Sequence, residues 1–241
     1  MSFDASQWVV SIPTYNEYKN SQTLFNMIFD SYPGISIIVV DGGSKDGTVE
    51  VLQQIEQERK PHFHVIHQKS PIGRGAADWE GFKYAQAHGF KYVVQMDADL
   101  SHAPHYISQF ASCMLENDMV IGSRLISGGK ILERKKRRNL LTWAANIFIR
   151  RMLNIPVYDC TSGYRCFNIE LLNKIGQQNT MTNGPANLTE VLYYAHQLGA
   201  KIKEVPIIFA DRQHGQSKLT GKELMESVRI VFRLRGQYAK L

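Results

Sequence analysis

ISIIVVDGGS, residues 35–44, joins a run of branched apolar residues to an aspartate, two glycines and a serine. Such a run, bounded by turn residues, is typical of a strand buried on both faces of a parallel sheet. Apolar residues then recur at helical spacing over residues 46–58, and Ser44 or Asp46 can cap that helix at its start. The segment therefore predicts a strand–helix unit with polar residues at the end of the strand.

Similar units lie on both sides of this one. We expect strands over residues 7–12, 35–40, 62–67, 91–96, 118–122 and 201–209. We expect helices over residues 21–31, 46–58, 140–153 and 188–199, after Gly75 through His88, from about Pro104 and from about Lys222. A basic loop precedes residue 140, and residues 158–166 are less regular. The alternation predicts an α/β fold, a mostly parallel sheet with helices on both faces, formed by one domain over residues 1–241.

In a sheet of this kind ligands bind beyond the carboxyl ends of the strands. This rule places residues 13–17, 41–44, 73–75 and 97–99 along one edge. Asp97 and Asp99 follow an apolar strand, and two carboxylates this close repel each other unless a cation lies between them. Mg²⁺ or Mn²⁺ binds such oxygens and shares its other positions with substrate phosphates. A solvated pair of turn acids is the alternative, and the position after a buried strand favours the metal.

Other polar segments allow more than one interpretation. Asp41 and its glycines suit a base or ribose, or an ordinary turn with a helix cap. The loop at 211–218 carries Arg212, Ser217 and Lys218, donors that suit a diphosphate, although a polar loop is often only solvated. Gly73-Arg74-Gly75 lacks the third glycine of a dinucleotide fingerprint. The histidines at 62, 64, 102 and 105 are expected in the core or on the surface, because neither pair has a third metal ligand.

Composition excludes several classes of protein. Of 241 residues 44% are hydrophobic, yet the longest unbroken apolar run is five residues, 191–195, which predicts no membrane span. The N-terminus carries an acid and no basic region, so we expect no secretory signal. The three cysteines, Cys113, Cys160 and Cys166, form no CxxC pair and are odd in number, which disfavours a disulfide framework or zinc site and favours a reducing compartment. Cys160 and Cys166 are expected to pack in the core.

The net charge of +6 is concentrated in one region. Residues 130–151 hold eight basic residues and one acid, so they carry +7 and the rest of the chain −1. This local charge indicates one anionic surface or ligand and disfavours a nucleic-acid binder. The run at 134–138 precedes an apolar helix around Trp143, a combination that fits an anionic membrane surface, although a solvated face or a localisation tract remains an alternative.

The order of the motifs along the chain is also informative. SIPTYNE at 11–17, VDGGSKDGT at 40–48, GRGA at 73–76 and MDADLSH at 96–102 are followed by GSR at 122–124, DCTSGYR at 159–165, EVPI at 204–207 and the 211–218 loop. Together they resemble the family-2 glycosyltransferases with the GT-A (Rossmann-like) fold, and within them the dolichyl-phosphate or polyprenyl-phosphate mannosyltransferases. The resemblance covers nearly the whole chain.

The resemblance implies a role for each matching residue. The nucleoside of a nucleotide-sugar donor is expected against Pro13, Tyr15, Glu17 and Asp41. Asp97 and Asp99 match the metal-binding acids, with Ser101 beside them where relatives often carry glutamine. Basic positions around the donor diphosphate and the acceptor phosphate are matched by Arg124, Arg138, Arg212 and Lys218, with the hydroxyl of Ser217 nearby. Asp99, Arg212 and Lys218 are the expected catalytic residues, residues 1–125 the donor half and residues 126–241 the acceptor half.

The resemblance implies a metal-dependent, inverting transfer of a sugar, mannose above others, from a nucleotide-sugar such as GDP-mannose or a UDP-sugar to a polyprenyl phosphate. Such an enzyme is expected in the cytoplasm, peripheral on the membrane face. The alternatives are transfer to a glycan or glycolipid hydroxyl, with Glu190 or Asp159 as the base, and a weakly catalytic binding subunit. Thr142-Trp143-Ala144 and residues 183–187 depart from the relatives' pattern on the acceptor side.

Overall fold

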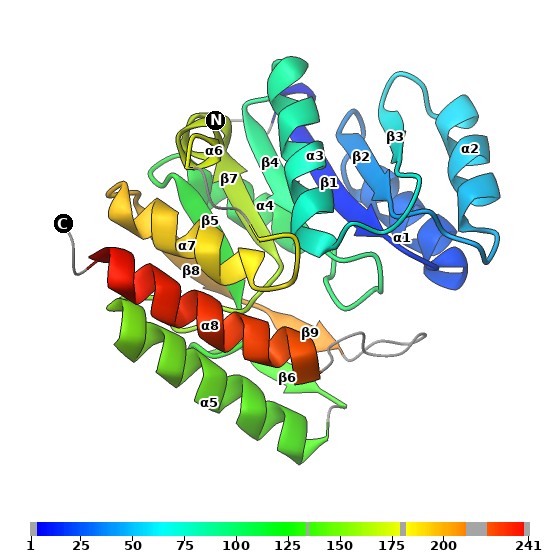
Figure 1. Ribbon diagram of the computed structural model, residues 1–241. Helices are drawn as coiled ribbons and strands as arrows, with labels where there is room; N and C mark the ends of the chain where they lie inside the picture. Colours follow the sequence, from blue (N-terminus) through cyan, green and yellow to red (C-terminus); the bar gives the residue numbers. More distant parts are fainter. Residues whose placement is uncertain (1–3, 134, 179–181, 211–220, 239–241) are drawn as a thin grey trace.

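A seven-stranded mixed sheet forms the centre of the computed structural model (Figure 1), which describes residues 4–133, 135–178, 182–210 and 221–238. Its strands, in the order β3-β2-β1-β4-β7-β5-β8, are β1 (Trp8–Thr14), β2 (Ser36–Asp41), β3 (Phe63–His67), β4 (Tyr92–Gln95), β5 (Met119–Ser123), β7 (Arg165–Asn168) and β8 (Ile202–Pro206). β7 runs antiparallel to both neighbours, and the other pairs are parallel. A second, two-stranded sheet pairs β6 (Lys130–Leu132) with β9 (Ile208–Ala210).

Helices cover both faces of the large sheet, as the sequence predicts. They are α1 (Tyr18–Ser31), α2 (Thr48–Glu58), α3 (Arg74–Ala87), α4 (Tyr106–Met114), α5 (Lys136–Leu153), α6 (Ile169–Gly176), α7 (Asn187–Gln197) and α8 (Gly221–Tyr238), with a 3₁₀ turn over Ala5–Gln7. One apolar core packs α1, α2 and α4 against the sheet, and a second packs α3, α6 and α7 against the other face. β2 is buried at every position, the environment that its apolar run predicts.

The order of the strands fixes where a ligand can bind. From β1 the chain builds outward through β2 and β3, then crosses back so that β4 pairs with the other side of β1. Strand order therefore reverses between β1 and β4, and the loops that leave these strands diverge. In α/β sheets this switch point opens a crevice outside the carboxyl ends of the strands.

The second half of the chain differs from the sequence prediction at several places, including β6 and α6, which the sequence analysis did not predict. The strand expected over residues 201–209 is two strands, because β8 pairs with β5 while β9 turns away to pair with β6. Residues 165–168 form β7, which inserts between β4 and β5 and makes the sheet mixed. The basic loop expected before residue 140 is helical from Lys136, so part of the basic run belongs to α5.

Helices α5 and α8 lie side by side at the edge of the molecule, both starting near the β6–β9 pair (Figure 1). Phe148 and Phe232 meet between them, with ring centroids 6.0 Å apart. Apolar side chains nevertheless stay exposed on both helices: Leu140, Leu141, Trp143, Leu224, Met225, Val228 and Phe232. Within the described part of the chain no helix combines the length and apolar character needed to cross a bilayer.

Candidate active site

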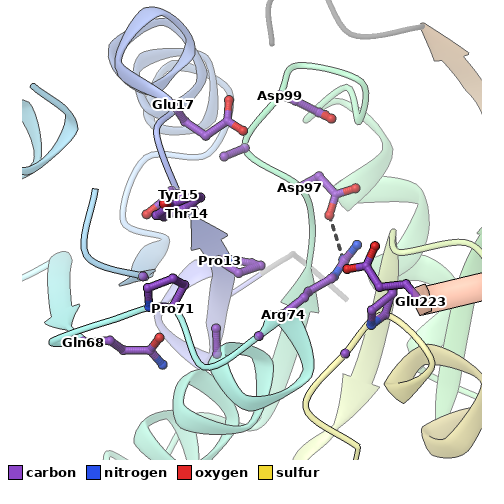
Figure 2. A pocket seen from close by; sticks show the side chains of 16 residues that line it. Pro13, Thr14, Tyr15, Glu17, Gln68, Pro71, Arg74, Asp97, Asp99 and Glu223 are labelled. Carbon is purple, nitrogen blue, oxygen red and sulfur yellow. Dashed lines mark ion pairs between the residues drawn. The ribbon is translucent and has the colours of Figure 1, made fainter. Parts of the chain in front are cut away.

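A cavity of about 460 Å³ opens at the switch point between β1 and β4 (Figure 2). Its lining comes from six parts of the chain: residues 13–17 at and after the end of β1, Gly42 after β2, residues 68–77 between β3 and the first turn of α3, residues 97–99 after β4, Gly184 and Pro185 before α7, and Glu223 in the first turn of α8. Five predicted site residues, Pro13, Tyr15, Glu17, Asp97 and Asp99, line it together. The rule that collects strand ends on one edge therefore located the cavity correctly.

Hydrogen bonds to Asp41 stabilise the side of the cavity formed by the ends of β1 and β2. The side chain of Asp41 is fully buried, and its Oδ1 accepts hydrogen bonds from the backbone N–H groups of Gly43 and Ser44 at 3.0 and 2.9 Å. Its Oδ2 accepts from the hydroxyls of Thr14 and Ser44 at 3.2 and 2.5 Å. In this structure Asp41 shapes the loop behind Tyr15, and it is not among the described residues that line the cavity.

The turn after β4 positions the two predicted metal-binding acids. Leu100 has φ of +63°, a left-handed conformation that is uncommon for a residue with a side chain. This turn brings the backbone N–H and the hydroxyl of Ser101 to Asp99 Oδ1, at 3.2 and 2.5 Å. Asp97 donates its backbone N–H to His102 Nδ1 at 3.0 Å. Backbone strain kept at such a place is typical of a functional site.

His102 supports this turn from the core. Its ring stacks on Tyr164 with centroids 4.8 Å apart, and the side chain is almost fully buried. Burial lowers the pKa of His102, although Asp97 and Asp99 oppose the shift, so the neutral ring accepts the hydrogen bond at Nδ1. Of the two places expected for the histidines, core or surface, His102 occupies the core, and its contact with the acidic turn is a role that the sequence did not reveal.

Sequence reasoning missed the arginine of the cavity. Arg74 is the first residue of α3, and its Nη2 lies 2.7 Å from Asp97 Oδ1 (Figure 2). Its Nε lies 3.5 Å from Oδ2 of Asp78, one helical turn further on and fully buried. Burial lowers the pKa of Arg74, but Asp97 and Asp78 outweigh it and the pKa is raised, so Arg74 is a permanent cation. In the sequence, residues 73–75 are expected on the ligand-binding edge and GRGA at 73–76 is one of the family motifs, but neither observation assigns a role to Arg74.

Two predicted phosphate-binding arginines lie elsewhere. Arg124 forms a buried ion pair with Asp159, with Nη2 to Oδ1 at 2.7 Å and Nε to Oδ2 at 2.8 Å. Burial alone would raise the pKa of Asp159, but the Arg124 guanidinium holds it below its ordinary value. Arg138 is half-buried in the first turn of α5. Neither arginine is among the described residues that line the cavity. Arg212, Ser217 and Lys218 lie outside the described residues.

The two carboxylates offered as possible bases are also engaged away from the cavity. Asp159 is held by Arg124. Glu190 on α7 accepts hydrogen bonds from the backbone N–H and the hydroxyl of Thr182, at 2.6 and 3.0 Å, and pairs with Arg233 of α8. Burial raises the pKa of Glu190, although these contacts oppose the shift. Neither carboxylate is among the described residues that line the cavity.

The charge balance of the cavity tests whether a divalent metal ion fits. Four carboxylates line it, from Glu17, Asp97, Asp99 and Glu223, against one guanidinium, that of Arg74, among the described residues. The described residues contain no group of three acids, histidines or cysteines able to hold a metal ion by themselves. Two neighbouring acids and a hydroxyl suit a hard cation that completes its shell with substrate phosphates. The donor set therefore fits Mg²⁺ or Mn²⁺ bound together with an anionic substrate.

The cysteines have no part in this chemistry. All three are unbridged, and Cys160 and Cys166 are fully buried. Burial raises the pKa of the Cys160 thiol to about 12, so it stays protonated and inert. The prediction that these two cysteines pack in the core is confirmed.

Comparisons with known proteins show which family the chain belongs to. Residues 9–176 match the family described as glycosyl transferase family 2. Polyprenol monophosphomannose synthase of Mycolicibacterium smegmatis is 34% identical over 221 residues, covering 91% of this chain and 83% of that protein. Undecaprenyl-phosphate mannosyltransferase of Micrococcus luteus is 33% identical over 217 residues, covering 90% and 89%.

Solved structures share the architecture. Glucosyl-3-phosphoglycerate synthase from Mycobacterium tuberculosis, crystallised with Mn²⁺, UDP-glucose and phosphoglyceric acid, superimposes with a TM-score of 0.68. The alignment covers 95% of this chain and 79% of that one, at 20% sequence identity. The crystal structure of the same enzyme with UDP gives a TM-score of 0.67 over 95% and 80% of the two chains. At 20% sequence identity the similarity concerns the fold, and the expected GT-A fold is confirmed.

Proposed function

Since this chain belongs to glycosyl transferase family 2, we propose that it transfers mannose from GDP-mannose to a polyprenyl phosphate at a membrane surface. Membership of the family makes the chain a glycosyltransferase. The observation that carries the choice of mannose and polyprenyl phosphate is the pair of mannosyltransferase relatives aligned over about nine-tenths of the chain. We take residues 1–125 as the donor half and residues 126–241 as the acceptor half of one catalytic domain.

The cavity suits a nucleotide-sugar donor. Tyr15 and Pro13 offer an aromatic ring and an apolar face for a nucleoside, and Glu17 offers a carboxylate to hydroxyl groups. Asp97 and Asp99, with Ser101, would hold the divalent ion beside the diphosphate. That ion, when bound, neutralises the charge that develops on the departing nucleoside diphosphate. Arg212 and Lys218 are proposed to add donors to the same leaving group.

The reaction is a single displacement with inversion. An oxygen of the acceptor phosphate forms a bond to the anomeric carbon as the bond from that carbon to the diphosphate breaks, and the nucleoside diphosphate leaves. The second pKa of a phosphate monoester is about 6, so the nucleophile is already ionised near pH 7 and requires positioning in place of a general base. Glu190 and Asp159, the two bases considered for a neutral hydroxyl acceptor, are held in ion pairs and do not line the cavity, which supports the phosphate acceptor over that alternative.

A panel of donors and acceptors tests the proposal. GDP-mannose and UDP-glucose would each be supplied with Mg²⁺ or Mn²⁺ to a polyprenyl phosphate, to the matching polyprenol without phosphate and to a soluble glycan. We expect a mannosyl-phosphate lipid from the phosphorylated acceptor alone, measured by mass spectrometry. Transfer to the polyprenol or the glycan at a comparable rate would reject the phosphate acceptor while leaving the donor assignment intact.

Charge and exposed apolar surface on α5 support docking to a membrane. Its first turn contains Lys136 and Arg137 and no acid, and the residue before the helix is Lys135. Helix N-termini already carry partial positive charge, so this end has a strongly positive potential. Trp143 is 56% exposed and Phe232 on α8 is 55% exposed, which offers apolar side chains for insertion. Together they suit a helix pair lying on an anionic lipid surface.

Replacing Lys135, Lys136 and Arg137 by glutamine is expected to abolish most binding to anionic vesicles. Each basic residue near an anionic surface contributes about 1 kcal/mol, so three together change the partition coefficient by about 100-fold. Vesicle flotation at low and high salt measures this, and the control is the same change at the exposed residues Lys60, Lys69 and Lys83. Equal loss in both triple variants would indicate that only net charge matters, and wild-type protein that ignores anionic vesicles would contradict membrane docking.

A further inference from the structure

Arg74 links a buried carboxylate to a carboxylate of the active site. Asp78 is fully buried one turn along α3, and it holds the Nε side of the guanidinium at 3.5 Å. The opposite side reaches Asp97, with Nη2 to Oδ1 at 2.7 Å. Opposite charges at this distance attract each other. Arg74 therefore binds the same carboxylate that is predicted to bind the metal ion.

The backbone of Gly163 lies directly against the guanidinium of Arg74. A Cβ atom at residue 163 would lie 2.6 Å from Nη2 and 3.1 Å from Nη1 of Arg74, closer than such atoms approach. The φ angle of Gly163 is outside the left-handed region, so a side chain at residue 163 would not strain the backbone but would displace the guanidinium of Arg74. Asp78, Asp97 and Gly163 thus enclose the guanidinium on three sides.

We propose that Arg74 is a resident cation that competes with the divalent metal ion for Asp97, so that metal and nucleoside diphosphate bind to the cavity together. This inference rests on the proposed function, which supplies the metal and the nucleotide. A metal ion arriving alone would have to displace the guanidinium from Asp97 and would remain beside its positive charge. A nucleoside diphosphate brings negative charge for Arg74 and oxygen ligands for the metal. It therefore offsets the cost of displacing the guanidinium from Asp97 and the repulsion between the guanidinium and the metal ion.

Thermodynamic linkage makes the competition measurable. If the nucleotide raises the affinity for the metal by some factor, the metal raises the affinity for the nucleotide by the same factor. A resident cation makes this coupling large, because it weakens metal binding only while the nucleotide is absent. Removing the cation should strengthen binding of the metal alone and reduce the coupling between metal and nucleotide. Loss of an ordinary metal-site residue should instead weaken binding of the metal both with and without the nucleotide.

The test measures binding of Mn²⁺ by titration calorimetry and by electron paramagnetic resonance of the unbound ion, with and without GDP. Arg74→Gln is expected to bind Mn²⁺ alone at least about 10-fold more tightly than the wild type, with the coupling to GDP reduced by a similar factor. Gly163→Ala keeps every charge and displaces the guanidinium, so a change in the same direction is expected. Lys83→Gln is the matched control, since Lys83 is exposed on the same helix and its replacement removes the same charge.

The outcomes separate this inference from the proposed function. Mn²⁺ affinity that is unchanged or weaker in both Arg74→Gln and Gly163→Ala overturns the inference, and if Asp97→Asn still removes Mn²⁺ binding the metal site stands. Absence of Mn²⁺ binding in the wild type with GDP present overturns the inference and the metal assignment together. Arg74→Gln leaves Asp78 buried without its partner, so thermal unfolding is followed for each variant. If that variant does not fold, the result with Gly163→Ala decides.

Discussion

Replacing Asp99 by asparagine is expected to lower kcat/KM for sugar transfer by about 100-fold or more while leaving the fold intact. Asp99 lines the cavity at the carboxyl end of β4, where the change removes one negative charge from the predicted metal site. Loss of one group that stabilises charge in a transition state typically costs 10²- to 10³-fold in rate. Steady-state kinetics with GDP-mannose and a polyprenyl phosphate at saturating Mn²⁺ measures the effect.

Local structure explains why the fold should survive this change. Asp99 Oδ1 accepts the N–H and hydroxyl of Ser101, and the amide oxygen of asparagine can accept the same hydrogen bonds. The melting temperature is therefore expected to stay close to that of the wild type. Glu223→Gln is the matched control, because Glu223 lines the same cavity and is not a predicted metal ligand. Turnover of Asp99→Asn equal to that of the wild type would remove Asp99 from the metal site.

Replacing Arg124 by glutamine is expected to destabilise the protein by about 3–5 kcal/mol, because it leaves the buried carboxylate of Asp159 without its partner. Arg124 is only 9% exposed in its side chain, so solvent screens the pair weakly. Urea unfolding at pH 7 measures the loss. The result also separates two roles: a phosphate-binding arginine would lose donor affinity at nearly constant stability, whereas the buried pair predicts the reverse.

The contribution of this pair depends on pH in a defined direction. The pKa of Asp159 in the folded protein is below the value of about 3.9 expected for an aspartate in the unfolded chain. The unfolded chain therefore takes up the proton first as pH falls, and the stability that the pair contributes above about pH 4 is lost as pH drops through the folded pKa. The difference in unfolding free energy between wild type and Arg124→Gln should shrink below about pH 4. A difference that stays constant down to pH 3 would contradict the assignment of the pair.

Predictions from the sequence succeeded where a property is local and periodic. The apolar run at 35–40 and the similar runs elsewhere in the chain specify strands, and helical spacing specifies the helices between them. The alternation of strands and helices leads to an α/β fold. The carboxyl-end rule then places Tyr15, Glu17, Asp97 and Asp99 around one cavity without any knowledge of side-chain positions. These conclusions follow from spacing along the chain.

Pairings between distant residues were decided by the tertiary structure alone. Arg74 meets Asp97, and Arg124 meets Asp159, across 23 and 35 positions of sequence, and no local pattern distinguishes an arginine that binds phosphate from one that neutralises a buried acid. The same holds for β7, whose antiparallel insertion depends on which strand edges remain unpaired once the rest of the sheet has formed. Sequence by itself determined most of the strands and helices and the acidic edge. Packing determined which charge faces which, because burial makes an unpaired charge too costly and selects the partner within reach.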